Sequence, residues 1–397
     1  DRLALPKLKG GGFARLFARG LALASRGWRG EGLVFQIPGG QALHVGPTTP
    51  ASPRLVLHDW SFARKVLLHG DIGLAEAYID GRWDCADLAR VLAALADNFE
   101  ALGRLTGGTG LARAADRLLH RLGKLNTRGG AKRNIAAHYD LGNDFYQGWL
   151  DPSMTYSSAL WGSPDLTLEQ AQAAKYRALA EALGLRPEHR VLEIGCGWGG
   201  FAEFAAREVG CHITALTISR AQHAFAVERM ARQGLSDRVE VRLVDYRQVE
   251  GRFDRIVSIE MVEAVGEAWW PAYFGALHDR LEPGGLAGLQ AITIRDDLFD
   301  AYRRRVDFIQ RYIFPGGMLL SEARLNAEAE RAGLAARPPR RFGKDYARTL
   351  NLWAERFMKA RTGDDRFDRL WRFYLAYCEA GFATGRTEVV QVVLARR

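Results

Sequence analysis

The sequence predicts an α/β fold in its larger, C-terminal part, preceded by a smaller, mostly helical N-terminal domain. From Asn134 onward, short apolar segments alternate with helical ones, which is the pattern of a doubly wound parallel sheet. Residues 61–101 instead carry apolar side chains at the three- and four-residue spacing of helices. A Gly-rich and then basic stretch between residues 103 and 133 separates the two regions. We therefore expect domains at 1–130 and 131–397.

The expected elements of the larger domain alternate in chain order. Parallel strands joined by helices bind ligands at their carboxyl ends, so polar residues just after a strand are the first site candidates. The expected strands are 190–194, 212–217, 239–244, 255–259 and 285–294, and the expected helices are 167–183, 201–209, 220–234 and 269–281.

The positive charge is concentrated at the N-terminal end. Residues 1–133 hold 20 Lys and Arg against 11 Asp and Glu, which accounts for the whole net charge of +9. There, Phe13, Leu16, Phe17 and Leu21 are interleaved with Arg15 and Arg19, and a strand-like piece follows at 33–37. Such a region favours an anionic partner, either lipid headgroups or nucleic acid, although a generally Arg-rich composition also explains it. No apolar run approaches the ~18–20 residues of a membrane span, so membrane contact is expected to be peripheral.

The four cysteines, Cys85, Cys196, Cys211 and Cys378, show no spacing typical of metal ligands or disulfides. We therefore expect no metal site and a reducing compartment, the cytoplasm, with the protein at the inner face of the membrane.

The strongest local pattern is VLEIGCGWGGF at 191–201, an apolar strand followed by a glycine-rich turn and a helix. Glycines let the backbone pass close under a ligand. A turn of this kind also serves dinucleotides, but the Glu193 carboxylate suits an ammonium group and repels a pyrophosphate. The pattern therefore predicts S-adenosylmethionine as the ligand of Glu193, Gly195, Cys196, Gly197 and Gly199.

Two further groups are expected to complete this ligand site. Asp245 and Tyr246 follow the third strand, where they are placed to bind an adenine edge. The second strand lacks the acid that usually holds the ribose hydroxyls, so Thr217 and Gln222 are expected to substitute. Cys196 is expected to pack in the turn rather than to act as a nucleophile.

Several specific segments, spread from about His58 to the end of the chain, resemble the cyclopropane-fatty-acyl-phospholipid synthases and the related mycolic acid methyltransferases. They include the cofactor turn and the segments GLAEAYIDGRWD at 73–84, HYDLGNDFY at 138–146, LDPSMTYS at 150–157, YIFPGGM at 312–318 and YARTL at 346–350.

The resemblance implies a class I, Rossmann-like methyltransferase domain, a lipid-facing N-terminal domain and a homodimer. It also implies that Tyr139, Tyr156 and Ser157 hold S-adenosylmethionine from the far side of the cleft. The family binds bicarbonate beside the reacting carbons through a cysteine, a glutamate, a histidine, an isoleucine backbone group and a tyrosine.

This chain matches three of those five bicarbonate positions, with Glu263, Ile292 and Tyr346. Ser158 stands at the cysteine position and Gln290 at the histidine position. Glu263 is expected to anchor the anion or to act as the base, and Tyr346 to hold the anion through its hydroxyl. The two replacements leave both bicarbonate binding and the product open.

The expected activity is transfer of a methyl group from S-adenosylmethionine to the double bond of an unsaturated acyl chain in a membrane phospholipid. Proton loss from the new methyl closes a cyclopropane ring, and the resemblance implies this cyclopropane fatty acid as the expected product. The alternative product is a methyl-branched or methylene chain, because Ser158 and Gln290 replace the cysteine and the histidine of the bicarbonate site. The alternatives are a small-molecule or RNA methyltransferase and an inactive lipid-binding relative. The neutral charge balance of the catalytic region argues against nucleic acid, and the intact glycine-rich turn argues against loss of catalysis.

Overall fold

The computed structural model describes residues 11–99, 102 and 141–397. The chain forms two compact units, the first made of residues 1–122, 304–308 and 357–386, and the second made of residues 123–303, 309–356 and 387–397. The predicted boundary near residue 130 lies outside the described residues.

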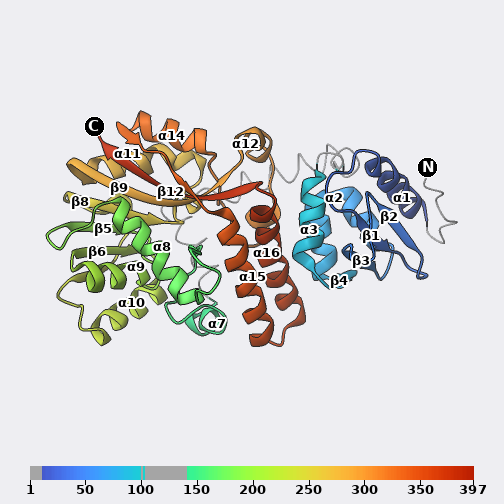
Figure 1. Ribbon diagram of the computed structural model, residues 1–397, viewed down its shortest axis with the longest axis horizontal. Coiled ribbons are helices and arrows are strands. Elements are labelled where there is room, and N and C mark those ends of the chain that lie inside the picture. The colour runs from blue at the N-terminus through green and yellow to red at the C-terminus, as the bar shows by residue number, and fades with distance from the viewer. Residues whose placement is uncertain (1–10, 100–101, 103–140) are drawn as a thin grey trace. The chain divides into compact units, whose positions relative to one another are not determined.

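The second unit is built on one mixed sheet (Figure 1). Its parallel strands run in the order β9-β8-β5-β6-β7. Their bounds are β5 (Arg190–Ile194), β6 (His212–Thr217), β7 (Val239–Leu243), β8 (Phe253–Ile259) and β9 (Leu281–Ile294). The predicted parallel α/β core is confirmed, and all five predicted strands are present.

An antiparallel edge completes the sheet beyond β9. Strand β12 (Thr387–Arg396) pairs antiparallel with β9, and both β10 (Leu334–Ala336) and β11 (Arg340–Arg341) pair antiparallel with β12. Strand β12 is buried over most of its length. This edge, which was not predicted, brings a C-terminal strand next to the middle of the domain.

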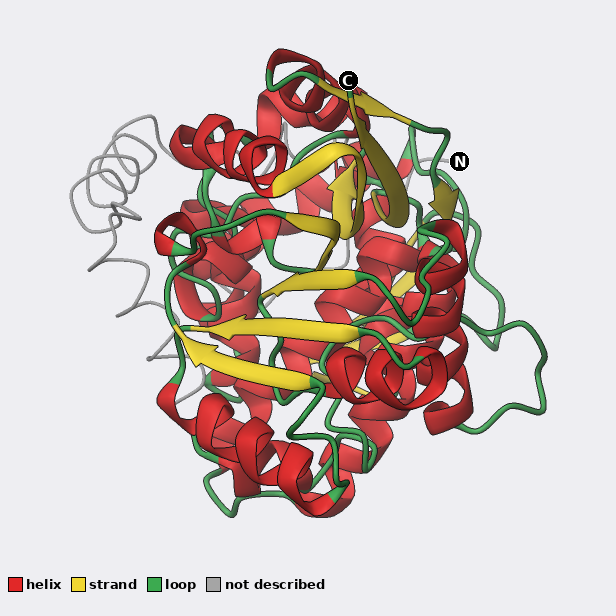
Figure 2. Ribbon diagram, turned by 90° about the vertical axis from the view of Figure 1, so that its left-hand side faces the viewer, coloured by secondary structure: helices red, strands yellow, loops and turns green. Residues whose placement is uncertain are grey.

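Helices cover both faces of the sheet (Figure 2). Helices α8 (Leu168–Ala182), α9 (Gly200–Phe204) and α10 (Arg220–Arg232) enclose one apolar core with β5 and β6, which includes Leu179, Phe201 and Met230. Helices α11 (Trp270–Arg280) and α14 (Glu322–Arg331) enclose the other core. Further α-helices in the described residues are α7 (Asn143–Gln147), α12 (Asp296–Tyr302), α13 (Phe308–Tyr312) and α15 (Gly343–Ala360). A π-helical turn lies at Ala205–Val209, and short 3-10 helices lie at Tyr246–Gln248, Val262–Ala264 and Glu267–Trp269.

The start of α8 is defined by a capping box. The Thr167 hydroxyl accepts from the Gln170 backbone N–H at 3.3 Å, and the Gln170 side chain accepts from the Thr167 N–H at 2.9 Å. This pair satisfies two backbone donors at the helix end. The register set there turns Gln172 and Lys175 to the buried side of the helix.

The first unit is mostly helical, as predicted, but it also contains a small sheet. The sheet has the order β2-β1-β3-β4, of which the sequence indicated only the strand at 33–37. Residues near the C-terminus also belong to this unit, because the Arg369 guanidinium donates to the Tyr78 carbonyl at 2.6 Å. Its elements are α1 (Gly12–Ser25), β1 (Leu33–Gln36), β2 (Ala42–Val45), β3 (Arg54–Leu57), α2 (Ser61–Ile79), β4 (Trp83–Cys85), α3 (Leu88–Asp97) and α16 (Asp365–Ala383). Across the described ranges, no helix combines the length and apolar character that crossing a bilayer requires.

Candidate active site

The glycine-rich turn joins β5 to α9 in a conformation that requires glycine. Gly195 has a φ of +83° and Gly199 a φ of +84°, a region that side chains other than glycine rarely adopt. A Cβ atom on Gly195 would also lie 2.9 Å from the Met261 Cγ. Cys196 is buried in the same turn, and burial raises the pKa of its thiol, so it packs there in the thiol form.

Glu193 is the buried acid of this turn, with an exposure of 3%. Burial raises its pKa to about 8, against the opposing influence of Arg229 and Lys175. Its Oε2 atom has no hydrogen-bond partner within the described part of the chain. A buried carboxylate oxygen without a partner is costly, and a ligand ammonium would satisfy it. The site therefore fits the amino-acid end of S-adenosylmethionine, and the role of Glu193 remains a prediction.

The structure brings the expected ribose-binding pair together. The Thr217 hydroxyl at the end of β6 donates to the Gln222 Oε1 atom in the first turn of α10 at 3.0 Å, and both side chains are buried. The Asp245 carboxylate accepts from the Arg247 guanidinium at 2.8 and 2.6 Å, so an adenine edge would share it with that arginine. Tyr246 packs edge-on against Tyr273.

The residues expected on the far side of the cofactor are placed in part. Tyr139 lies outside the described residues. The Tyr156 ring packs against the rings of Trp149 and Trp353 at centroid distances of 5.6 and 5.4 Å. The Ser157 hydroxyl accepts from the Lys175 ammonium at 2.6 Å.

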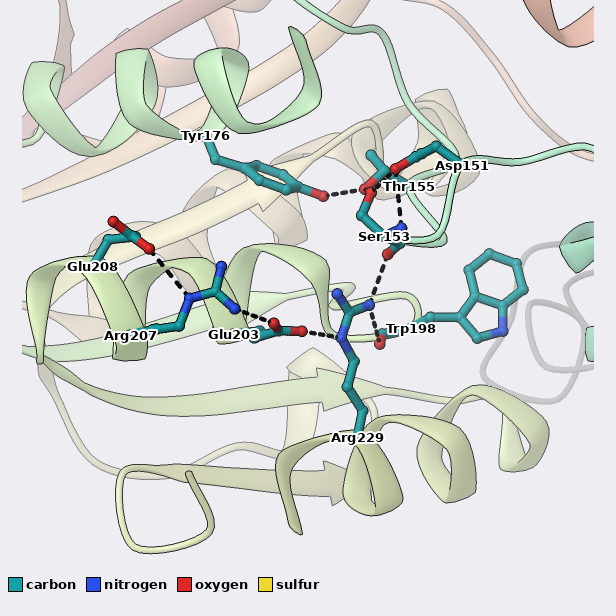
Figure 3. A network of polar contacts seen from close by, with 9 residues as sticks. All are labelled: Asp151, Ser153, Thr155, Tyr176, Trp198, Glu203, Arg207, Glu208 and Arg229. Carbon is teal, nitrogen blue, oxygen red and sulfur yellow. Dashed lines mark hydrogen bonds and ion pairs between the residues drawn. The ribbon is translucent and has the colours of Figure 1, made fainter. Parts of the chain in front are cut away.

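Arg229, on α10, joins the cofactor turn to the loop that precedes α8 (Figure 3). Its guanidinium donates to the Ser153 carbonyl at 2.7 Å and to the Trp198 carbonyl at 3.3 Å, and it forms an ion pair with Glu203. In the same network, the Thr155 hydroxyl bonds the Tyr176 hydroxyl at 2.8 Å. Through these contacts Arg229 links the glycine-rich turn to the loop that contains Ser153.

Three of the predicted catalytic residues surround a carboxylate that the sequence analysis missed, that of Glu260. Its Oε1 atom accepts from the Ser158 backbone N–H at 2.9 Å and from the Gln290 amide at 2.8 Å, and its Oε2 atom accepts from the Tyr346 hydroxyl at 2.6 Å. Ser158 contributes its N–H, because its own hydroxyl donates to the Ala159 carbonyl at 2.9 Å. Ser158 therefore contacts Glu260 through its backbone rather than through its side chain.

Glu260 directly follows β8 with a φ of +49°, which is unusual for a residue other than glycine. Such a conformation costs about 1–3 kcal/mol and persists only where surrounding contacts enforce it. Here those contacts are the three donors to the carboxylate. Its position after a strand at the carboxyl edge of the sheet is the signal that could have identified it, as that signal did for Glu263.

Glu263 lies near Glu260, but its carboxyl group has fewer hydrogen-bond donors around it. Its Oε1 atom accepts from the Ile292 N–H at 2.5 Å, so these two predicted residues contact each other. Its Oε2 atom is buried and has no hydrogen-bond partner among the described residues. Burial, followed by repulsion from Glu260, raises its pKa to about 8. Burial also raises the pKa of Glu260, but Tyr346, Lys175, Ser158 and Gln290 oppose that shift. The donors and the Lys175 charge therefore favour the ionised form of Glu260, whereas burial favours the protonated form of Glu263.

A parallel sheet with a glycine-rich turn after β5, a buried acid at that turn and polar residues at the strand ends defines a class I, S-adenosylmethionine-dependent methyltransferase. The chain belongs to the mycolic acid cyclopropane synthetase family, whose family model matches residues 127–392.

Known members of this family are similar over most of the chain. The tuberculostearic acid methyltransferase of Mycobacterium tuberculosis is 39% identical over 377 residues, covering 89% of this chain and 85% of that protein. The cyclopropane-fatty-acyl-phospholipid synthase of Escherichia coli is 36% identical over 368 residues, covering 89% and 90%. The structure of the mycolic acid cyclopropane synthase CmaA1 in complex with SAH and CTAB superposes with a TM-score of 0.64 at 29% identity, covering 69% of this chain and 99% of that one.

Proposed function

We propose that this protein transfers the methyl group of S-adenosylmethionine to the double bond of an unsaturated acyl chain in a membrane phospholipid, and that the Glu260 carboxylate accepts the released proton. The contacts of Glu260 with Ser158, Gln290 and Tyr346 are the observation that carries the proposal. The names of the two similar lipid-modifying enzymes support the substrate class.

The reaction needs a base only after the methyl group has moved. When bound, S-adenosylmethionine supplies an electrophilic methyl group. The alkene π electrons form the new C–C bond, the bond to sulfur breaks with its electron pair on sulfur, and the neighbouring chain carbon becomes cationic. The protein keeps water away from that cation and removes one proton from the lipid. Glu260 fits this step because it is buried, ionisable and held by three donors.

Glu260 also replaces the bicarbonate of the resembling family in our proposal. Its carboxylate occupies the donors at the cysteine, histidine and tyrosine positions. A bicarbonate ion would find these donors already occupied and would be repelled by the negative charge of Glu260. Its binding is therefore disfavoured. We therefore expect turnover to be independent of added bicarbonate.

For the product, we favour the methyl-branched or methylene chain. In our proposal the base is the Glu260 carboxylate, which is fixed to the chain after β8, whereas the resembling family uses a bound bicarbonate ion. Similarity to the Escherichia coli cyclopropane synthase supports ring formation as the second candidate. Methyl-deuterated cofactor, mass spectrometry and NMR of the lipid product distinguish them. A ring retains two deuteriums and shows ring carbons, whereas a methylene chain retains two and shows alkene carbons. Loss of a chain proton retains all three. Ring carbons would exclude the branched product.

Helix α1 is the part of the protein that we propose to dock on the membrane. Phe13, Leu16 and Leu23 are 45%, 56% and 57% exposed on this one helix, and their spacing of three and seven residues places them on one side. The exposed residues Arg15 and Arg19 lie beside them. Residues 2–30 contain seven basic and no acidic side chains. An apolar stripe next to a row of arginines suits the surface of an anionic bilayer.

Co-sedimentation with phosphatidylglycerol vesicles tests this surface. The double substitution Leu16→Ser and Leu23→Ser is expected to weaken binding about tenfold, since both apolar contacts are lost. Val227→Ser is the matched control, because Val227 is 44% exposed on α10. Added salt should weaken binding of the unmodified protein. Equal losses in both variants would argue against α1 as the docking helix.

A further inference from the structure

Lys175, on α8, is fully buried beside the Glu260 cluster, with an exposure of 0%. Lysine is almost never fully buried unless it is paired. Its ammonium donates to the Ser157 hydroxyl at 2.6 Å and lies 4.3 Å from the centroid of the Tyr176 ring. The carboxylates that act on it through space are Glu260, Asp151 and Glu193.

Lys175 is also connected to Glu260 through the backbone of the segment at 157–158. The Gln172 amide, one turn earlier on α8, donates to the Ser157 carbonyl at 2.9 Å, while Lys175 holds the hydroxyl of the same serine. The next N–H along the chain, that of Ser158, donates to the Glu260 carboxylate. Two adjacent side chains of α8 therefore fix the segment that holds the proposed base.

We propose that Lys175 is a positioning residue that keeps the Glu260 carboxylate ionised, through its positive charge and by holding the Ser157–Ser158 segment in place. This inference rests on the proposed role of Glu260 as the proton acceptor. A carboxylate that remained protonated in the dry site could not accept a proton from the lipid. Lys175 acts without touching the substrate.

The charges that face Glu260 come from several elements. Lys175 contributes a positive charge from α8, Tyr346 a neutral hydroxyl from α15, Gln290 an amide from β9, and Glu263 a carboxyl that repels it when ionised. Two carboxylates act on Lys175 itself: Asp151, which precedes α8, and Glu193, which lies on β5. Arg229, on α10, in turn lowers the pKa of Glu193.

The charge on Lys175 depends on pH. Burial lowers the pKa of Lys175 to about 7, against the attraction of the nearby carboxylates. The lysine therefore carries its charge below about pH 7 and loses it above. In the unmodified enzyme, turnover should fall on the acid side as Glu260 is protonated, and the charge of Lys175 should hold this acid limb at lower pH.

Lys175→Met tests this, with kcat measured between pH 5.5 and 8.5 using S-adenosylmethionine and dioleoylphosphatidylglycerol vesicles. Loss of an opposite charge nearby raises a carboxyl pKa by about one unit or more. The acid limb should move up by about one pH unit, and kcat at pH 6 should fall about tenfold. Lys175→Gln, which keeps a donor for Ser157 but no charge, should shift the profile in the same way.

Gln172→Leu is the matched control, because it removes a neutral hydrogen bond to the same serine from the same helix. It should lower kcat without moving the acid limb. A profile of unmodified shape in Lys175→Met or Lys175→Gln, whatever its amplitude, would overturn the inference.

A readout without turnover separates this inference from the proposed function. In 13C NMR, the carboxyl resonance of Glu260 is identified as the one that is absent from the Glu260→Gln protein. The chemical shift of this resonance reports whether Glu260 is ionised. In Lys175→Met this resonance should titrate at higher pH than in the unmodified protein, and an unshifted titration would overturn the inference. An unmodified enzyme that methylates no lipid would instead refute the proposed function.

Discussion

Replacing Glu260 by glutamine removes the proposed base while keeping its shape. The amide oxygen can still accept from the Ser158 N–H and the Gln290 amide, at the positions where the carboxylate accepts at 2.9 and 2.8 Å. The amide nitrogen can donate to the Tyr346 hydroxyl, which rotates to accept. All three contacts therefore survive, and the free energy of unfolding should change by no more than about 1 kcal/mol.

The catalytic effect of the same change should be large. A positioned general base contributes about 10²–10⁴ in rate, and an amide cannot accept the proton. We expect kcat for lipid methylation to fall by roughly that factor. The melting temperature and the affinity for S-adenosylhomocysteine should stay close to those of the unmodified enzyme.

The assay follows transfer of a labelled methyl group into phospholipid vesicles, with thermal unfolding measured on the same preparation. Tyr346→Phe is the comparison variant, because it removes one donor but leaves the carboxylate. It should retain more activity than Glu260→Gln and move the acid limb of the rate profile to higher pH, since that hydrogen bond lowers the pKa of Glu260. A Glu260→Gln enzyme within about threefold of the unmodified kcat would show that the base lies elsewhere.

Three further predictions concern the cofactor side and the stability of the fold. Glu193→Gln should weaken both S-adenosylmethionine and S-adenosylhomocysteine by ~1–3 kcal/mol in calorimetry, because both ligands carry the ammonium; unchanged affinity would remove that assignment. Arg229→Met should raise the KM for S-adenosylmethionine more than it lowers kcat, since the Trp198 and Ser153 carbonyls lose their shared donor, and a loss confined to kcat would contradict this. Glu193 and Glu263 have pKa values raised from 4.5 to about 8, so the ligand-free fold binds protons that the unfolded chain releases. The stability that these two groups contribute should therefore be fully present below about pH 4.5 and be lost as pH rises through about 8. Urea unfolding at pH 5.5 and 8.5 should show a smaller loss for Glu263→Gln than for the unmodified protein, and an equal loss would argue against this linkage.

The bounds of β5 and β6 and the glycine-rich turn were predictable because their signals are local. A strand of the parallel core shows as a short apolar run, and a turn with positive φ angles demands glycine at particular places. The antiparallel strand β12 was not predicted, since its pairing with β9 joins residues about a hundred positions apart. Nor did the sequence show that α16 packs with α2 and α3 rather than with the sheet.

In the candidate site, too, the sequence showed the features with local signals, and the tertiary structure was needed for the contacts between distant residues. The sequence by itself predicted one site for Ser158, Gln290, Glu263, Ile292 and Tyr346, through the resemblance of the segments that carry them. Only the tertiary structure decided that a carboxylate, Glu260, lies among three of them, and that Lys175 is buried next to it. Neither residue was a candidate from the sequence, because the groups that contact each of them come from separate elements. Chain folding alone brings those groups within hydrogen-bond or charge-interaction range in a dry interior, where burial determines which of them is charged.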